Sequence, residues 1–97
     1  EEEDVHRPYA LTTLGHVMLK RNQPQQALQW LREAVANARQ TSDKYAEAFA
    51  WIALADAHQQ TGHAGEMRNA LKEALALCQQ LGLAETQAVL ARLKAAE

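Results

Sequence analysis

The side chains that could carry out catalysis or bind a metal ion are four histidines and one cysteine. His58 and His63 lie on either side of Gly62, so together they could hold a metal ion or act as an acid and a base. A metal centre needs further carboxylate, imidazole or thiolate ligands at ligand spacing, and none recurs around this pair. We therefore interpret the histidines as partly buried or surface residues and expect no metal.

Cys78 is the only cysteine, and it stands 40 residues after Ala38, at a position where a small side chain packs. We expect a buried, inert thiol there rather than a nucleophile. The sequence also has no glycine-rich phosphate loop and no serine, histidine and aspartate arrangement typical of hydrolases. These patterns favour a protein that is not an enzyme and that carries no cofactor.

The composition narrows the choice of partner. The chain has 97 residues and a formal net charge of −2, and its lysines and arginines are not clustered, so we expect no direct contact with nucleic acid. No apolar run is long enough to cross a membrane and no leader is visible. A single cysteine is compatible with a reducing compartment, so we expect a cytoplasmic protein. Because the chain does not begin with Met, we expect it to be a piece of a longer protein.

A duplication organises the elements that must position these residues. The stretch Leu11–Ala34 returns forty residues later as Trp51–Ala74, with the turn residue Asn22 replaced by Gly62. Apolar residues recur at three- and four-residue intervals within both copies, which is the period of an amphipathic helix. A repeat of this size is typical of a solenoid, whose units bury their apolar faces against one another.

The helix signals divide the chain into five helices, at about residues 4–21, 24–41, 43–60, 64–81 and 84–96. Pro24 suits a first helical turn, Asn22, Gly62 and Gly82 suit left-handed ends, and Ser42 or Asp43 can cap the third helix. Short turns between helices require antiparallel packing. We predict one all-α domain over residues 1–97, with repeat 1 at about 5–41, repeat 2 at about 43–81 and a capping helix at about 84–96.

The buried face of the first helix follows from its spacing. Leu11, Leu14, Val17 and Met18 form one apolar stripe, which we expect to pack against the other helices. Trp51 takes the place of Leu11 in the second copy, so it is expected in the core, whereas Trp30 is expected to cover the gap to the next repeat.

The duplicated pattern resembles the tetratricopeptide repeat. Its landmarks are Leu11, Leu14, Gly15, Met18, Ala27 and Leu31 in the first unit, and Trp51, Leu54, Ala55, His58, Met67 and Leu71 in the second. The resemblance implies an antiparallel helix-hairpin solenoid in which Gly15 and Ala55 let the partner helix approach. The 40-residue period exceeds the family's 34, and in this the chain is similar to the long-helix repeats of bacterial signal-responsive activators and cell-polarity scaffolds.

The resemblance also implies a concave groove lined by the first helix of each hairpin. The groove residues it points to are Tyr9, Thr12, Thr13, His16, Lys20, Phe49, Ile52, Asp56, Gln60 and Arg92, with Ala53, Ala88 and Ala91 in the same rows. The Lys and Asn set that clamps carboxylate termini in one subgroup is absent, because Thr12 and His16 replace it. Tyr9 and Phe49 could anchor a ligand, or they could fill the space between adjacent first helices.

The function implied is a protein-interaction module that binds a peptide or helix of a partner, as part of a larger scaffold or regulator. The alternatives are self-association as a homodimer and sensing of a small ligand. Lys94 replaces a small packing residue in the fifth helix, which favours a cap whose outer face meets water. The first helix has no such cap, so we expect its free face to meet a missing neighbour or a second copy.

Overall fold

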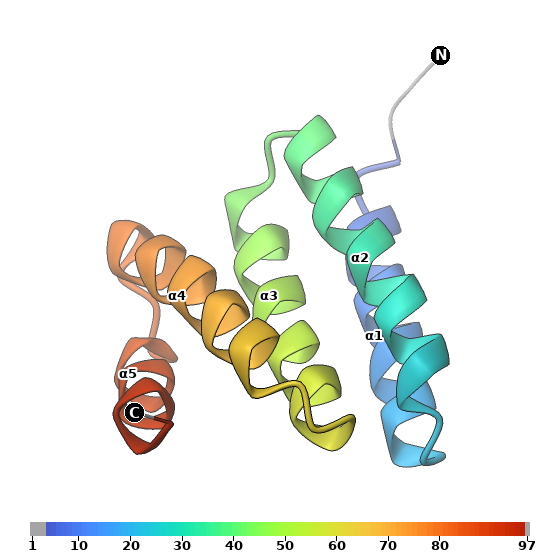
Figure 1. The fold of residues 1–97 in the computed structure, drawn as a ribbon. Coiled ribbons are helices and arrows are strands. Elements are labelled where there is room, and N and C mark those ends of the chain that lie inside the picture. Colours follow the sequence, from blue (N-terminus) through green and yellow to red (C-terminus); the bar gives the residue numbers. More distant parts are fainter. Residues whose placement is uncertain (1–3, 97) are drawn as a thin grey trace.

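The computed structural model describes residues 4–96, and this part of the chain is a succession of α-helices without a strand (Figure 1). The helices are α1 (Arg7–Lys20), α2 (Pro24–Gln40), α3 (Lys44–Gln60), α4 (Ala64–Leu81) and α5 (Thr86–Ala95). Helices α1, α2 and α3 each pack extensively on the helix that follows. Smaller contacts join α4 to α5 and α1 to α3. The predicted all-α architecture of stacked helical hairpins is confirmed.

The turns between helices use the predicted left-handed residues and one more. Asn22, Gly62 and Gly82 have φ values of 60°, 77° and 66°, and Ser42 has 57°. The cap of α3 is therefore Asp43, whose Oδ1 accepts a 3.0 Å hydrogen bond from the Ala46 backbone N–H. Sequence reasoning left Ser42 and Asp43 open for this role, and the structure decides for Asp43.

Two helices are shorter than predicted at their N-termini. α1 begins at Arg7 because Asp4 closes a turn before it: its Oδ1 accepts from the His6 backbone N–H at 2.9 Å, and its carbonyl accepts from Arg7. α5 begins at Thr86 because the Thr86 hydroxyl and backbone N–H both donate to the Leu83 carbonyl, at 2.7 and 3.2 Å. In both places a local turn replaces the first helical turn.

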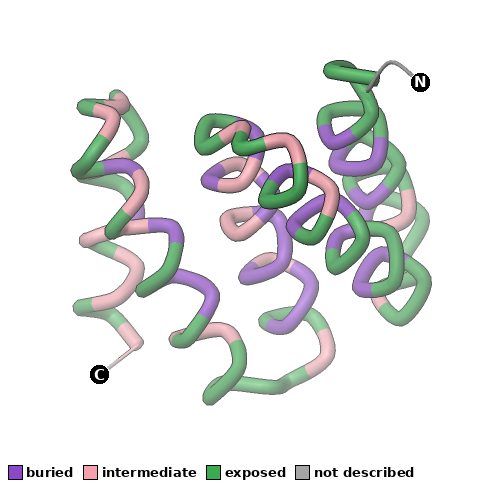
Figure 2. Tube along the Cα trace, turned by 90° about the horizontal axis from the view of Figure 1, so that it is seen from above, coloured by how far each residue is buried: buried purple, intermediate pink, exposed green. Residues whose placement is uncertain are grey.

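The helix with the most buried residues is α3, which packs against α1, α2 and α4, and Figure 2 shows how buried segments run through the stack. Eight of its residues are buried: Ala46, Ala48, Ala50, Ala53, Leu54, Ala55, Ala57 and His58. Six of these eight are alanines, and their small size allows α1, α2 and α4 to approach α3 closely. Trp51 was expected in the core, but it is only partly buried and packs against the core from outside.

Gly15 sets the contact between α1 and α2. A Cβ atom placed there would collide with the side chain of Leu31, which is itself fully buried. Ala55 and Leu71, the residues forty positions later, are both fully buried as well. The predicted close approach is confirmed at Gly15, and at Ala55 it stays a prediction that the burial of both residues supports.

The predicted apolar stripe of α1 is only half right. Leu11 is buried and Met18 is partly buried, but Leu14 and Val17 are 39% and 37% exposed. The reason is that α1 contacts only α2 and α3 among the described helices, and these two leave one side of α1 uncovered. Trp30 is also 38% exposed, and the expectation that it covers the gap to the next repeat stays a prediction.

Candidate functional site

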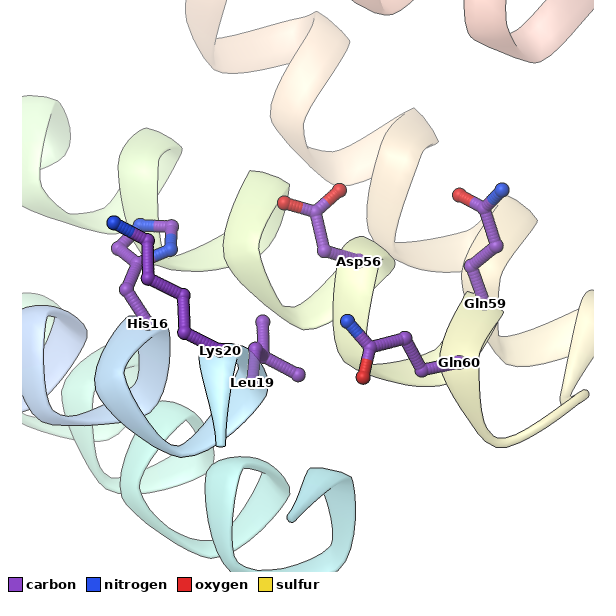
Figure 3. A pocket seen from close by; sticks show the side chains of 6 residues that line it. All are labelled: His16, Leu19, Lys20, Asp56, Gln59 and Gln60. Carbon is purple, nitrogen blue, oxygen red and sulfur yellow. The ribbon is translucent and has the colours of Figure 1, made fainter. Parts of the chain in front are cut away.

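A hollow of about 620 Å³ lies where the C-terminal halves of α1 and α3 meet (Figure 3). His16, Leu19 and Lys20 line it from α1, and Asp56, Gln59 and Gln60 line it from α3. We call this the α1–α3 hollow. Four of the ten predicted groove residues are therefore neighbours around one depression.

Arg92 from α5 joins the same region. Its Nη1 lies 2.9 Å from Asp56 Oδ1, and its Nη2 donates a 3.1 Å hydrogen bond to Gln59 Oε1. A guanidinium fixed by two partners is held in one orientation, so Arg92 also restrains the Asp56 carboxylate at the rim. In Figure 3 His16 and Lys20 lie together on the α1 side, with Asp56 on the α3 side.

The wall of the α1–α3 hollow therefore carries charges of both signs. Lys20 can donate to a carboxylate or to a peptide carbonyl, and Asp56 can accept from a peptide N–H or a lysine. Gln59 and Gln60 can do both. Leu19, which is mostly buried, supplies the apolar part of the lining. This mixture suits a polypeptide better than it suits an apolar small molecule.

Tyr9 stands apart from the hollow and has a structural partner. Its hydroxyl donates a 3.2 Å hydrogen bond to Asp43 Oδ1, the same oxygen that caps α3. Burial and then the neighbouring Asp43 raise the pKa of the Tyr9 phenol, so the hydroxyl stays protonated and able to donate. Tyr9 thus links the start of α1 to the turn between α2 and α3, and its ring remains partly exposed beside that link.

The other predicted groove residues do not line the hollow. Thr12 is only 8% exposed and its hydroxyl donates to the Pro8 carbonyl at 2.9 Å, so the expectation of an accessible contact there is wrong. Thr13 is exposed but does not line the hollow, which lies further along α1, and its counterpart forty residues on, Ala53, is fully buried. Phe49 and Ile52 are partly buried, and Ile52 packs against the core.

Sequence reasoning missed two residues of the hollow. Leu19 and Gln59 occupy the same position of the two repeats, forty residues apart, and each lies three residues after a predicted groove residue, His16 or Asp56. That i, i+3 spacing on one helix face was the signal that could have found them.

A second cluster of titratable groups lies at the turn between α3 and α4. His58, His63 and Glu66 can place one ligand atom each within 4.8 Å of one another. Sequence reasoning found no such third ligand, because Glu66 reaches the histidines only through the turn and the first helical turn of α4. The cluster has two of the ligand types that zinc uses, with Glu66 the acidic one.

The surroundings of this cluster favour a neutral, packed His58. Burial and then the positive charge of Arg32 lower the pKa of His58, and its Nδ1 is buried with no hydrogen-bond partner among the described residues. His63 Nδ1 lies 2.9 Å from the Thr61 hydroxyl, within hydrogen-bonding distance. A metal ion would have to displace that bond and face Arg32, so we read the cluster as a packed turn.

Cys78 has the environment expected of an inert thiol. It is fully buried, and burial raises its pKa above the ordinary value, which disfavours the reactive thiolate. Among residues 4–96, no helix is both long enough and apolar enough to cross a membrane.

The sequence was compared with models of known protein families, with curated proteins and with solved structures. The family model of anaphase-promoting complex subunit 5 matches residues 1–51 and again residues 44–91. The chain belongs to this family. The second match begins at Lys44, the first residue of α3, so the family model covers the chain once for each hairpin. Searches among curated proteins and among solved structures returned no match.

The family membership agrees with the predicted helical repeat at the coarse level. It describes a subunit of a multi-protein complex built from helical repeats, which is consistent with a role in protein interaction. It gives no support to the predicted similarity to bacterial activators, and that finer resemblance stays a prediction.

Proposed function

We propose that this chain is a non-enzymatic protein-interaction module that binds an extended or helical segment of a partner protein in the α1–α3 hollow. The observation that carries the proposal is the convergence of His16 and Lys20 from α1 with Asp56 and Gln60 from α3 on one depression, where Arg92 of α5 holds the Asp56 carboxylate. Two helices about forty residues apart in sequence thus supply donors and acceptors to the same surface.

The chemistry of the hollow describes the segment it suits. An acidic side chain of the partner would lie toward Lys20, and a backbone N–H or a basic side chain would lie toward Asp56. The amides of Gln59 and Gln60 would bind peptide groups between them. Leu19 would contact an apolar side chain near the centre, where burial contributes most to binding.

The family favours a protein partner over a small ligand. A complex subunit is a protein that assembles with other proteins, so the proposal needs no ligand of another kind. A volume of about 620 Å³ lies within the range of small-molecule sites, but a lining with one apolar residue among six does not resemble them. Small-ligand sensing is therefore the weaker candidate.

The test begins with selection of peptide binders from a phage-displayed library of random linear peptides against the purified chain. We expect Lys20→Glu to weaken the selected peptides at least about tenfold, since about 1.4 kcal/mol corresponds to each factor of ten. Lys72→Glu is the matched control, because Lys72 is equally basic and exposed but lies on α4, outside the hollow.

The experiment separates docking in the hollow from binding elsewhere. The affinity should be measured by calorimetry, with circular dichroism to confirm that each variant stays folded. Binders that are equally weakened by Lys20→Glu and Lys72→Glu would show a general charge effect, and binders unaffected by Lys20→Glu would refute the proposed site.

A further inference from the structure

One side of α1 is an apolar surface that no described helix covers. Ala10, Thr13, Leu14 and Val17 lie along it at helical spacing, and all four are exposed. We call these four residues the α1 outer face. Exposed aliphatic side chains that gather on one face are typical of an interaction surface.

The duplication within the chain shows what such a face does when it is covered. The residues forty positions later are Ala50, Ala53, Leu54 and Ala57 on α3, and their exposed fractions are 0%, 0%, 3% and 0%. Leu14 and Leu54 are the same residue type at the same repeat position, yet 39% of one is exposed and 3% of the other. The difference is that α3 is preceded by a hairpin, α1 and α2, which packs on it.

We propose that the α1 outer face binds the second helix of another helical hairpin, lying antiparallel to α1 as α2 lies against α3. The inference is independent of the α1–α3 hollow, because Thr13, Leu14 and Val17 do not line it. It rests on the interface between α2 and α3. The α3 side of that interface is repeated on α1, but no helix among the described residues packs on α1 as α2 packs on α3.

The interface between α2 and α3 gives the chemistry of the missing partner. Leu28 and Val35 of α2 are 3% and 6% exposed, and they stand seven residues apart on its buried side. Arg39, a further four residues on, places its Nε 3.0 Å from Glu47 Oε2 and lies over the Trp51 ring at 5.4 Å. The partner helix should thus carry two aliphatic residues seven positions apart, at the places of Leu28 and Val35. Four positions after the second of them, at the place of Arg39, a further residue should contact the start of α1.

The charge at that last position should differ from Arg39. Forty residues before Glu47 stands Arg7, which is half exposed and lies 3.9 Å from Glu33 of α2. An arginine brought to this place by the partner would face Arg7, so the interaction would be repulsive. We therefore infer an acidic residue there, opposite in sign to Arg39.

A second copy of this chain is a poor source of the partner helix. The helix equivalent to α2 is α4, and α5 already packs on it. Moreover, α4 has Arg68 where α2 has Leu28, and the Arg68 guanidinium donates to the Ala96 carbonyl at 3.4 Å. Neither the apolar residue nor a free surface is available on α4, so the partner is a hairpin with a different sequence.

The test extends the chain with its own repeat. In the tandem chain, residues 4–43 form a first copy that is joined directly to residues 4–97, the second copy. The α2 helix of the first copy then precedes the α1 helix of the second copy by the same number of residues as α2 precedes α3 in the original chain. Leu14→Asp in the original chain should lower the urea midpoint only modestly, because Leu14 is partly exposed there and the change costs mainly helix propensity. The same change in the second copy of the tandem chain should lower the folding equilibrium constant at least about tenfold.

The tandem chain contains its own matched controls. Leu14→Asp in the first copy keeps the exposed setting and should have little effect. Arg39→Glu in the first copy faces Arg7 and should raise the urea midpoint, whereas Arg39→Glu in the second copy faces Glu47 and should lower it. Equal effects of Leu14→Asp in both copies, or of Arg39→Glu in both copies, would overturn the proposal.

Light scattering on the original chain tests whether a second copy of the chain covers the α1 outer face. We expect a monomer at all concentrations. A dimer that Leu14→Asp converts to a monomer would show that a second copy covers the α1 outer face, and the proposal of a hairpin of different sequence would then be wrong.

Discussion

Gly15 is the residue whose substitution the structure constrains most. Gly15→Leu should lower the free energy of unfolding by about 1–3 kcal/mol or more, because the added side chain overlaps Leu31 at the closest approach of α1 and α2. Urea denaturation followed by circular dichroism measures this. Gly65→Ala is the control: nothing lies within 4 Å of a Cβ there, so removing an exposed helical glycine should stabilise the protein slightly.

His58 makes the stability depend on pH. Burial and Arg32 lower its pKa in the folded state from the ordinary value of 6.5, so the unfolded chain binds the proton more tightly than the folded chain. The contribution of the neutral imidazole is complete above pH 6.5, and it is lost as the pH falls from there through the lowered pKa. We expect the urea midpoint to decrease between about pH 7 and pH 5.

The matched variants for this prediction are His58→Phe and His16→Gln. The first replaces a buried imidazole by a ring that cannot be protonated and should remove most of the decrease. The second changes an exposed histidine on α1 and should leave the decrease in place. A pH profile that is the same in His58→Phe and in the original chain would show that another group is responsible.

At the scale of the helices, Asp43 joins three elements. Its carboxylate caps α3 and accepts the Tyr9 hydroxyl, so α1, α3 and the turn after α2 meet at one side chain. Asp43→Ala should destabilise the protein by about 0.5–2 kcal/mol, the usual cost of losing an N-cap. Thermal unfolding of Asp43→Ala beside Asp43→Asn checks this, because asparagine keeps the cap and should retain most of the stability.

Tyr9→Phe separates the two roles of Asp43. It removes the hydrogen bond to Asp43 while leaving the cap intact, so its effect should be smaller than that of Asp43→Ala. If Tyr9→Phe were as harmful as Asp43→Ala, the link between α1 and the turn would matter more than the cap.

The fifth helix is the least buried element. Only Val89 is buried in α5, and its ion pair between Arg92 and Asp56 is partly exposed, so the pair is expected to contribute less than about 1 kcal/mol. Lys94 is exposed, which agrees with the predicted polar outer face of a capping helix, although its role as a cap remains a proposal.

Across the whole molecule, stability should be highest in the middle and lowest at α5. Hydrogen exchange should be slowest for the backbone amides of α3, because α1, α2 and α4 all pack on it, and fastest for those of α5. Mass spectrometry or NMR after transfer to deuterated water measures this order. Equal protection in α3 and α5 would mean that the chain opens only as a whole.

The sequence by itself determined the helices, their order and their hairpin arrangement. Those features depend on local signals: Pro24 and Asp43 start helices, Gly62 and Gly82 end them, and the apolar spacing is repeated after forty residues. Gly15 was also predictable, because the repeat pattern shows where a small residue must face a large one.

Four of the six residues that line the candidate site were predictable for the same reason. His16, Lys20, Asp56 and Gln60 follow from the position of each first helix in the repeat. Leu19 and Gln59 complete the hollow at the i+3 position, but only the crossing of α1 and α3 decides which turn of each helix lines it.

Burial on α1 was decided by the tertiary structure alone. Leu14 and Leu54 have the same residue type and the same place in the repeat, so no local pattern distinguishes them, yet one is exposed and the other buried. Glu66 stands three residues after His63, a spacing visible in the sequence, whereas His58 joins the two only because the turn brings α4 back against α3. A helix face is buried by its neighbour, and the neighbour is a property of the assembled fold rather than of the residue.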